Sequence, residues 1–337
     1  MRKSLVTFAL GAAIPAIVAA QPAASMTVEQ LLNRLGIPAA NVAQFTSGKP
    51  MVMSVPATAD TEIAAAGAVR VKGDLRRLVV WLRDIESFMK ATGTVNVGAI
   101  ASPATPADFA RISLNSTDVN DLKACTSKSC SIRMPEAFLP RFQNEVSWTT
   151  GAAPAQASTL ARTLVAEYVA AYQKGGDAGL AQFHDASKPR EQSDQFLDML
   201  RRSTKVWELS HPFVTYLESY PQSAPAGTES RFYWTRDEMS GKPALTLHHV
   251  LLQELPGGRV LAADKQFYAS REIDSALMIA FAVPNAEGSG FDLVVSVKAR
   301  SNAVRGVAAR VLRGRIDKGM REGLATYLQW IQDSFKL

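Results

Sequence analysis

The C-terminal third of this 337-residue chain contains five strand-like segments followed by one long amphipathic helix. Loops rich in Gly and Pro separate the segments, as at Pro256-Gly257-Gly258. Because strands joined by such short loops pair as antiparallel neighbours, one helix is left to cover the resulting meander. The segments are Arg231–Asp237, Ala244–Leu255, Val260–Ser270, Ala276–Pro284 and Phe291–Ser301, with the helix over residues 304–332. The predicted fold class is α+β, a curved antiparallel sheet gripping the C-terminal helix, which can enclose a cavity.

Alternation along the strands predicts which side chains face that helix. In the last strand Leu293 and Val295 share an apolar face, whereas Ser296 lies on the other. In the second strand the odd positions are apolar, so His249 is expected to face inward and His248 outward. The residues expected to line the cavity are Trp234, Leu247, His249, Leu251, Phe281, Leu293 and Val295, with Gly319 and Met320 from the helix.

The C-terminal helix carries an apolar stripe from Leu312 to Leu328 and several glycines, including Gly319. Each glycine inside a helix costs about 1 kcal/mol relative to Ala, which is reasonable where the backbone lies against a sheet or leaves room for a ligand. Arg and Lys side chains occupy the other faces of the helix. They form either a solvated surface or a surface that binds an anionic membrane or an acidic ligand.

The N-terminus has the pattern of a cleaved export signal. Arg2 and Lys3 precede an apolar stretch, and Val18-Ala19-Ala20 fits cleavage between Ala20 and Gln21. The stretch has about 16 residues where a spanning helix needs roughly 20, and an uncleaved anchor is the alternative interpretation. We therefore expect an exported protein, periplasmic or secreted. Removal of the two basic residues lowers the net charge from +6 to +4.

The rest of the chain divides into a lead-in, a first strand-helix-strand part, a mainly helical middle, and the meander with its helix. With the signal at 1–20, the boundaries are 21–61, 62–102, 103–227 and 228–337. In the middle segment, the clearest helix is expected at Ala155–Lys174, because Leu160, Leu164 and Tyr168 stand four residues apart. Shorter helices are expected at 177–184, 191–203 and 212–220.

Cys125 and Cys130 are the only cysteines. In an exported protein, an even pair this close in sequence predicts a local disulfide. Four residues separate the two, whereas a redox-active pair normally has two residues between its cysteines. No His follows at the spacing of a zinc site.

Motifs of common catalytic and cofactor sites are absent, including Gly-x-Ser-x-Gly, His-Glu-x-x-His, the phosphate-binding loop and the dinucleotide fingerprint. Neighbouring strand residues face opposite sides, so His248 and His249 cannot bind one metal ion, and we expect no metal and no cofactor. The modest net charge does not indicate a nucleic-acid partner. His249 is either a general acid or base in the cavity or a core histidine bonded to Gln253 or a backbone carbonyl.

The order of elements carries a family resemblance. The strand and helix that begin Glu62-Ile-Ala-Ala-Ala-Gly-Ala-Val-Arg-Val-Lys-Gly-Asp-Leu, the meander and the C-terminal helix resemble the START / SRPBCC helix-grip superfamily. The resemblance covers about residues 60–100 and 225–335, has no diagnostic motif, and makes residues 103–220 a large insertion. It implies a hydrophobic cavity between sheet and helix that binds lipids, sterols or polyketide-like molecules. The chain is also similar, more distantly, to uncharacterised exported bacterial proteins.

Three functions are consistent with these patterns. The leading hypothesis is non-catalytic binding of a hydrophobic or amphipathic small molecule, such as a lipid, between sheet and helix. The second is a cyclase-like or hydrolytic enzyme that uses His249 or Tyr233 in the same cavity. The third is a structural or interaction module with a filled core, which an enclosed volume below about 300 Å³ would favour. The sequence does not indicate the oligomeric state.

Overall fold

The computed structural model describes residues 28–34, 37–180, 183–185, 188–190, 192–203, 209–239, 241–285, 288–306 and 309–336. The predicted export signal and its cleavage site lie outside these residues.

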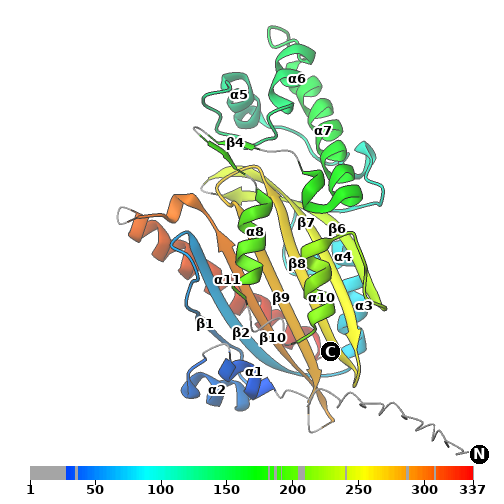
Figure 1. Cartoon of the computed structure of the whole chain (residues 1–337), viewed down its shortest axis with the longest axis vertical. Coiled ribbons are helices and arrows are strands. Elements are labelled where there is room, and N and C mark those ends of the chain that lie inside the picture. Colours follow the sequence, from blue (N-terminus) through cyan, green and yellow to red (C-terminus); the bar gives the residue numbers. More distant parts are fainter. Residues whose placement is uncertain are drawn as a thin grey trace, which may run out of the picture.

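An eight-stranded antiparallel sheet forms the centre of the molecule (Figure 1). Its strand order is β1-β2-β10-β9-β8-β7-β6-β3, so the meander from β6 to β10 lies between strands contributed by the N-terminal part of the chain. The strands are β1 (Met51–Ser54), β2 (Glu62–Lys72), β3 (Val97–Ile100), β6 (Thr228–Met239), β7 (Lys242–Leu255), β8 (Arg259–Ala269), β9 (Ser275–Pro284) and β10 (Gly290–Arg300). A separate two-stranded sheet contains β4 (Phe183–Asp185) and β5 (Lys188–Arg190). The predicted α+β class and the five strands of the meander are confirmed.

Three helices cover one face of the sheet, which we call the α11 face. Helices α3 (Leu75–Arg83) and α4 (Ile85–Ala91) follow β2, and α11 (Arg310–Ser334) follows β10. Phe88 and Leu328 from these helices share one hydrophobic cluster with Val250, Leu293 and Val295 from alternate strand positions. The long C-terminal helix therefore packs on the sheet as predicted.

Close packing of α11 depends on a glycine in the sheet rather than on those in the helix. Gly67 of β2 lies opposite Val295 of β10. A Cβ at Gly67 would lie 2.6 Å from Cδ1 of Leu328 and 2.8 Å from the carbonyl oxygen of Met51. By contrast, Gly319 is exposed, with no atom within 4 Å of the position its Cβ would take. The expectation that Gly319 makes room for a sheet or a ligand is therefore wrong.

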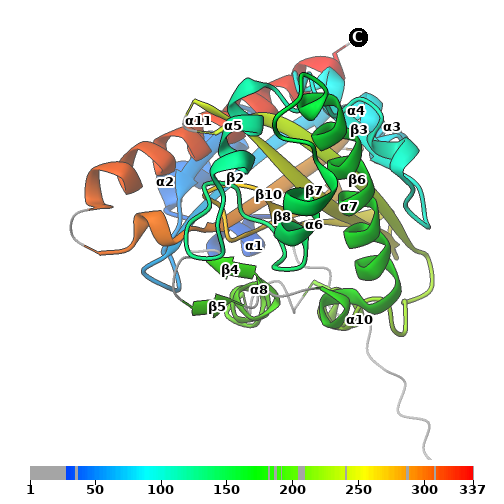
Figure 2. The ribbon, with the colours of Figure 1, turned by 90° about the horizontal axis from the view of Figure 1, so that it is seen from above.

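Helices also cover the opposite face, which we call the α10 face, so the expectation of a single covering helix is wrong. Figure 2 shows α11 and α3 on one side of the sheet and α8 and α10 on the other. The helices of the α10 face are α1 (Val28–Arg34), α2 (Ala39–Thr46), α7 (Ala153–Gly175), α8 (Gln192–Arg201) and α10 (His211–Ser219). They pack on alternate strand residues such as Leu251, Leu277 and Phe281. Both faces of most strands are therefore buried.

The first part of the mainly helical middle extends beyond one end of the sheet (Figure 1). It contains α5 (Ser116–Ala124), α6 (Phe138–Glu145) and part of the long helix α7, with 3-10 turns at Pro106–Phe109 and Gly176–Gly179. The predicted disulfide joins Cys125 and Cys130 after α5. The Arg271 side chain is only 5% exposed and links this region to the sheet. It donates hydrogen bonds to the Asp121 carboxylate (2.8 Å) and to the Ser131 carbonyl oxygen (2.9 Å).

Two local features differ from the sequence-based expectations. The lead-in contributes a strand, because β1 pairs with β2 from Met51 opposite Ala68 to Ser54 opposite Ala65. The helix expected at 177–184 is instead the 3-10 turn Gly176–Gly179 followed by β4. In that turn the Asp177 carboxylate pairs with Lys265 of the sheet at 2.5 Å, a long-range contact that local helix propensity does not reveal.

The two glycines give a matched test of how α11 packs. Gly67→Ala is expected to destabilise the protein by about 1–3 kcal/mol, because the added methyl overlaps Leu328 and the β1 backbone. Gly319→Ala adds the same methyl in open space and is expected to stabilise by about 0.5–1 kcal/mol through helix propensity. Urea unfolding midpoints measure both effects. Equal shifts of the same sign would contradict the close approach at Gly67.

The disulfide is expected to hold a loop rather than the fold. Mass spectrometry without reductant should detect no free thiol in the mature protein. Replacing both Cys125 and Cys130 by Ala should lower the free energy of unfolding by no more than about 2 kcal/mol, because the two cysteines are only 5 residues apart. Two alkylatable thiols, or loss of folding in the double variant, would contradict this.

Candidate ligand-binding site

A pocket of about 280 Å³ lies between the α11 face of the sheet and helices α3, α4 and α11. Side chains from these helices and from strands β6 to β10 form its wall, and most of them are apolar. The apolar wall includes Leu82, Phe88, Met89, Val250, Leu293 and Val297. The polar side chains in the wall are Thr92, Tyr233, His248, Asp264, Gln266 and Tyr327.

A corner between α3 and α4 places the helical side of the pocket. Asp84 ends α3 and caps α4, and its carboxylate accepts a hydrogen bond from the Ser87 backbone N–H at 3.2 Å. The chain turns there, so Leu82 at the end of one helix and Ile85 and Phe88 of the next all line the same pocket.

Residue size along β9 explains why space remains on this face. Leu277, Ile279 and Phe281 are buried in the core of the α10 face. Ala276, Met278 and Ala280 alternate with them, line the pocket and are only half-buried. A large side chain at either alanine would occupy the pocket, so the small residues keep it open.

A hydrogen-bonded chain of side chains crosses the polar part of the wall. The Tyr233 hydroxyl donates to Oδ2 of Asp264 at 2.5 Å, and Nδ1 of His248 lies 2.9 Å from Oδ1 of the same carboxylate. Nε2 of His248 lies 2.8 Å from Oγ1 of Thr246, which is 2.7 Å from Oγ1 of Thr235. The rings of Tyr233 and His248 stack with their centroids 4.5 Å apart.

The partners in this chain determine where the protons lie. A carboxylate only accepts hydrogen bonds, so Nδ1 of His248 donates to Asp264; when the ring is neutral, Nε2 accepts from the Thr246 hydroxyl. Burial, reinforced by the Asp264 charge, raises the pKa of Tyr233 well above its usual value, so Tyr233 remains a donor. Both oxygens of Asp264 and both ring nitrogens of His248 are therefore engaged within the protein.

Two further polar groups line the pocket. Gln266 is 5% exposed, and within the described part of the chain its Nε2 has no hydrogen-bond partner. Tyr327 of α11 also lines the pocket, and burial, with the nearby Asp264 charge, raises the pKa of its hydroxyl. Strand register places Gln266 directly opposite His248, which lies opposite Tyr233. The polar groups therefore form a row across β6, β7 and β8.

The residues predicted to line one cavity are divided between the two faces of the sheet. Leu293, Val295 and Met320 lie on the α11 face, and of these Leu293 lines the pocket. The residues that lie instead in the cores of the α10 face are Trp234, Leu247, His249, Leu251 and Phe281. The assignment failed because helices cover both faces of β7 and β9, so alternation alone could not show which face meets α11.

The two adjacent histidines lie on the opposite faces of the sheet from those predicted for them. His248, expected to point outward, lines the pocket, whereas His249 is fully buried on the α10 face. Nδ1 of His249 lies 3.0 Å from the Tyr172 hydroxyl and Nε2 lies 3.2 Å from Oγ of Ser230. Burial, together with the charge of Lys265, lowers its pKa well below the usual value. His249 is therefore a core histidine, as the second interpretation expected, but its hydrogen-bond partners in the described residues are the Tyr172 and Ser230 side chains rather than Gln253 or a backbone carbonyl.

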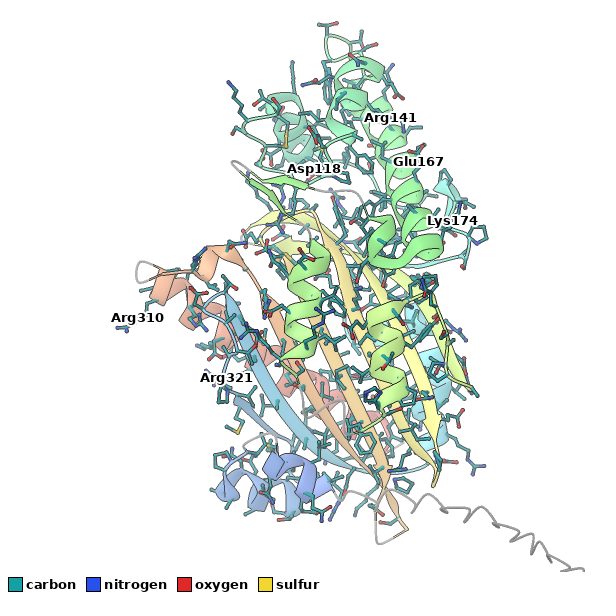
Figure 3. All side chains as sticks on the ribbon, in the orientation of Figure 1. Asp118, Arg141, Glu167, Lys174, Arg310 and Arg321 are labelled. Carbon is teal, nitrogen blue, oxygen red and sulfur yellow. A yellow bond between two sulfur atoms is a disulfide. The ribbon has the colours of Figure 1, made fainter. Side chains whose placement is uncertain are left out.

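The basic side chains of α11 do not share one role. Arg313 donates to the carbonyl oxygens of Asp60 and Glu62, both at 2.6 Å, and Arg321 pairs with Asp317 at 3.1 Å. Arg310 is exposed at the outer end of the helix (Figure 3). The predicted apolar stripe is buried only in its second half, because Leu312 is 38% exposed.

Comparisons with known proteins do not assign a family. No protein-family model matches the chain, and no curated protein matches it. In the described ranges, no helix is long and apolar enough to cross a membrane, and no group of three or more His, Cys, Asp or Glu residues could hold a metal ion. The function must therefore be inferred from the pocket itself.

The hydrogen-bonded chain predicts the tautomer of His248. In the neutral form of this imidazole, the proton is expected on Nδ1, because that nitrogen faces the Asp264 carboxylate. Two-bond ¹⁵N–¹H correlation spectra of ¹⁵N-labelled protein distinguish the two nitrogens, and His248→Gln identifies the signals. A neutral ring protonated on Nε2 would contradict the arrangement.

Proposed function

We propose that this protein binds a compact, mainly apolar small molecule, without changing it, in the pocket between the sheet and α3, α4 and α11. The composition of the pocket wall carries the proposal: apolar side chains form most of it, and Tyr233, His248 and Gln266 form one polar row. Small-molecule sites typically combine a concave apolar surface with a few placed polar groups.

The size of the pocket narrows the class of ligand. Its volume of about 280 Å³ lies just below the roughly 300–1,000 Å³ typical of ligand pockets, so that volume alone favours a module with a filled core, and the composition of the wall is what favours a ligand. That volume suits a compact ring system or a short chain better than a whole membrane lipid. If no ligand binds, the third hypothesis holds, and the protein is a structural or interaction module.

An enzyme is the second candidate, because the paired His248 and Asp264 line the same pocket. A general base needs a free nitrogen within hydrogen-bond reach of the proton it removes. Nε2 of His248 is engaged by Thr246, and this favours binding over catalysis. Recovery of an unchanged ligand would support binding, whereas conversion that is lost in His248→Gln would support the enzyme.

We propose that the protein acts after export. The Cys125–Cys130 disulfide is consistent with an oxidising compartment and supports this proposal. The packing of a long C-terminal helix on an antiparallel sheet agrees with the resemblance to the helix-grip superfamily, in which a ligand lies between the two.

A pocket-filling variant tests the proposal directly. N-phenyl-1-naphthylamine, a compact apolar dye, is expected to bind the wild-type protein with a saturable increase in fluorescence. Ala280→Phe places a ring in the pocket and should weaken dye binding by about tenfold or more, because ligand and side chain compete for one volume.

Ala325→Phe is the matched control, since it adds the same ring to the exposed side of α11. It should leave dye binding unchanged, and thermal melts should show that both variants are folded. Equal dye affinity in Ala280→Phe and wild type would exclude this pocket as the binding site. In addition, native mass spectrometry of protein purified from its host should reveal a co-purifying small molecule.

A further inference from the structure

The net positive charge of this protein is concentrated in one segment, which leads into α11 and forms its first half. Residues 21–337 have a net charge of +4. Residues 305–322 contain six Arg or Lys and two Asp or Glu, which is an excess of four positive charges. The other residues of the range 21–337 therefore balance, and the excess is local rather than spread over the surface.

Three arginines of α11 have no carboxylate partner among the described residues. Arg310 and Arg315 are exposed and form no ion pair there. Arg313 donates only to backbone carbonyl oxygens, which leave its charge uncompensated. The remaining basic side chains of the segment each lie beside a carboxylate: Arg305, Lys318 and Arg321.

Two large apolar side chains are exposed in the same part of the helix. Val311 is 68% exposed and Leu312 is 38% exposed. Arg310 precedes them, and Arg315 stands four residues after Val311, so the two share one side of the helix. Only the second half of α11 has buried side chains. Exposed aliphatic side chains beside Arg and Lys are typical of a helix that lies in a lipid interface.

A groove of about 360 Å³ runs beside these side chains, between the start of α11 and strands β1 and β2. Arg310 and Arg313 line it. The acid in its described wall, Asp317, already accepts hydrogen bonds from Ser54 at 2.7 Å and from Arg321 at 3.1 Å. The groove therefore presents two guanidinium charges, and phosphate is an anion that guanidinium groups bind well.

We propose that the first half of α11 docks this protein on an anionic lipid surface. Val311 and Leu312 enter the interface, and Arg310, Arg313 and Arg315 meet the lipid phosphates. A soluble acidic partner would match the charges, but burial of the exposed aliphatic pair favours lipid.

The position of the helix suits this contact, because α11 begins at the margin of the molecule (Figures 1 and 2). The inference goes beyond the proposed function and does not depend on it, since the docking side chains do not line the ligand pocket.

Co-sedimentation with vesicles tests the charge match. Wild-type protein at low salt should bind vesicles of equal parts phosphatidylcholine and phosphatidylglycerol, and should bind phosphatidylcholine alone about tenfold more weakly or less. The double variant Arg310→Glu and Arg315→Glu should weaken binding to the mixed vesicles about thirtyfold or more, because two attractive charges become repulsive. Both positions are exposed, so melting temperatures should show that it folds.

The matched control is the double variant Lys123→Glu and Lys128→Glu, which makes the same charge change at exposed positions in the middle segment. It should retain most of the binding. Equal loss in both double variants, or equal binding of wild type to both kinds of vesicle, would overturn the local charge match. Failure of wild type to bind the mixed vesicles would overturn the docking itself.

A second pair of variants tests the insertion. Val311→Gln should weaken binding to the mixed vesicles about threefold or more, because a side chain buried in the interface becomes polar. Val95→Gln makes the same change at a position that is 81% exposed and lies before β3, and it should bind as wild type does. Unchanged binding of Val311→Gln would overturn insertion and favour a soluble acidic partner. Dye binding in the ligand pocket should be the same in all four variants.

Discussion

The pairing of β2 with β10 is the constraint on which the rest of the structure depends. It joins positions far apart in the sequence over the full length of both strands, from Lys72 opposite Gly290 to Glu62 opposite Arg300. Because α3 follows β2 and α11 follows β10, this one ladder brings both helices to the same face of the sheet. The pocket lies between these helices and the strands on one side of the ladder, β9 to β6. Gly67 in the ladder sets how closely α11 approaches.

Because helices cover both faces of the sheet, polar residues that are neighbours on one strand lie in different environments. His248 and His249 are adjacent in sequence, yet one lines the pocket and the other lies in a closed core beside Tyr172. Lys265 shows the same effect next to Asp264: it is 2% exposed, pairs with Asp177, and burial lowers its pKa against the opposing influence of that carboxylate. The buried pair on the α10 face holds the turn after α7 against the sheet. The polar row on the α11 face instead borders open space, and for this reason we place the ligand there.

The elements were easier to predict from the sequence than their placement. Turn residues and alternation identified the five strands of the meander, and the spacing of Leu160, Leu164 and Tyr168 identified α7, because these signals are local. The sequence could not show which strand residues face α11, because helices from the middle of the chain bury the other side of the sheet as well. The importance of Gly67 was equally hidden, because it depends on Leu328, which is distant in sequence. A usable signal for the pocket was nevertheless present: on β9, two small residues, Ala276 and Ala280, share a face with Met278 and alternate with Leu277, Ile279 and Phe281.

That alternation bears on why the pocket exists at all. A sheet face under three helices would be more stable with large apolar side chains that fill the space, as they do on the opposite face of β9. This chain instead has Ala276 and Ala280 on either side of Met278 on that face of β9, and in the same wall a buried Gln266 whose Nε2 is unbonded. Each feature lowers stability, and the two occur in the same pocket. Local departures from good packing and hydrogen bonding are expected where function requires them. A bound molecule that fills the space beside Ala280 would remove the first of these deficits.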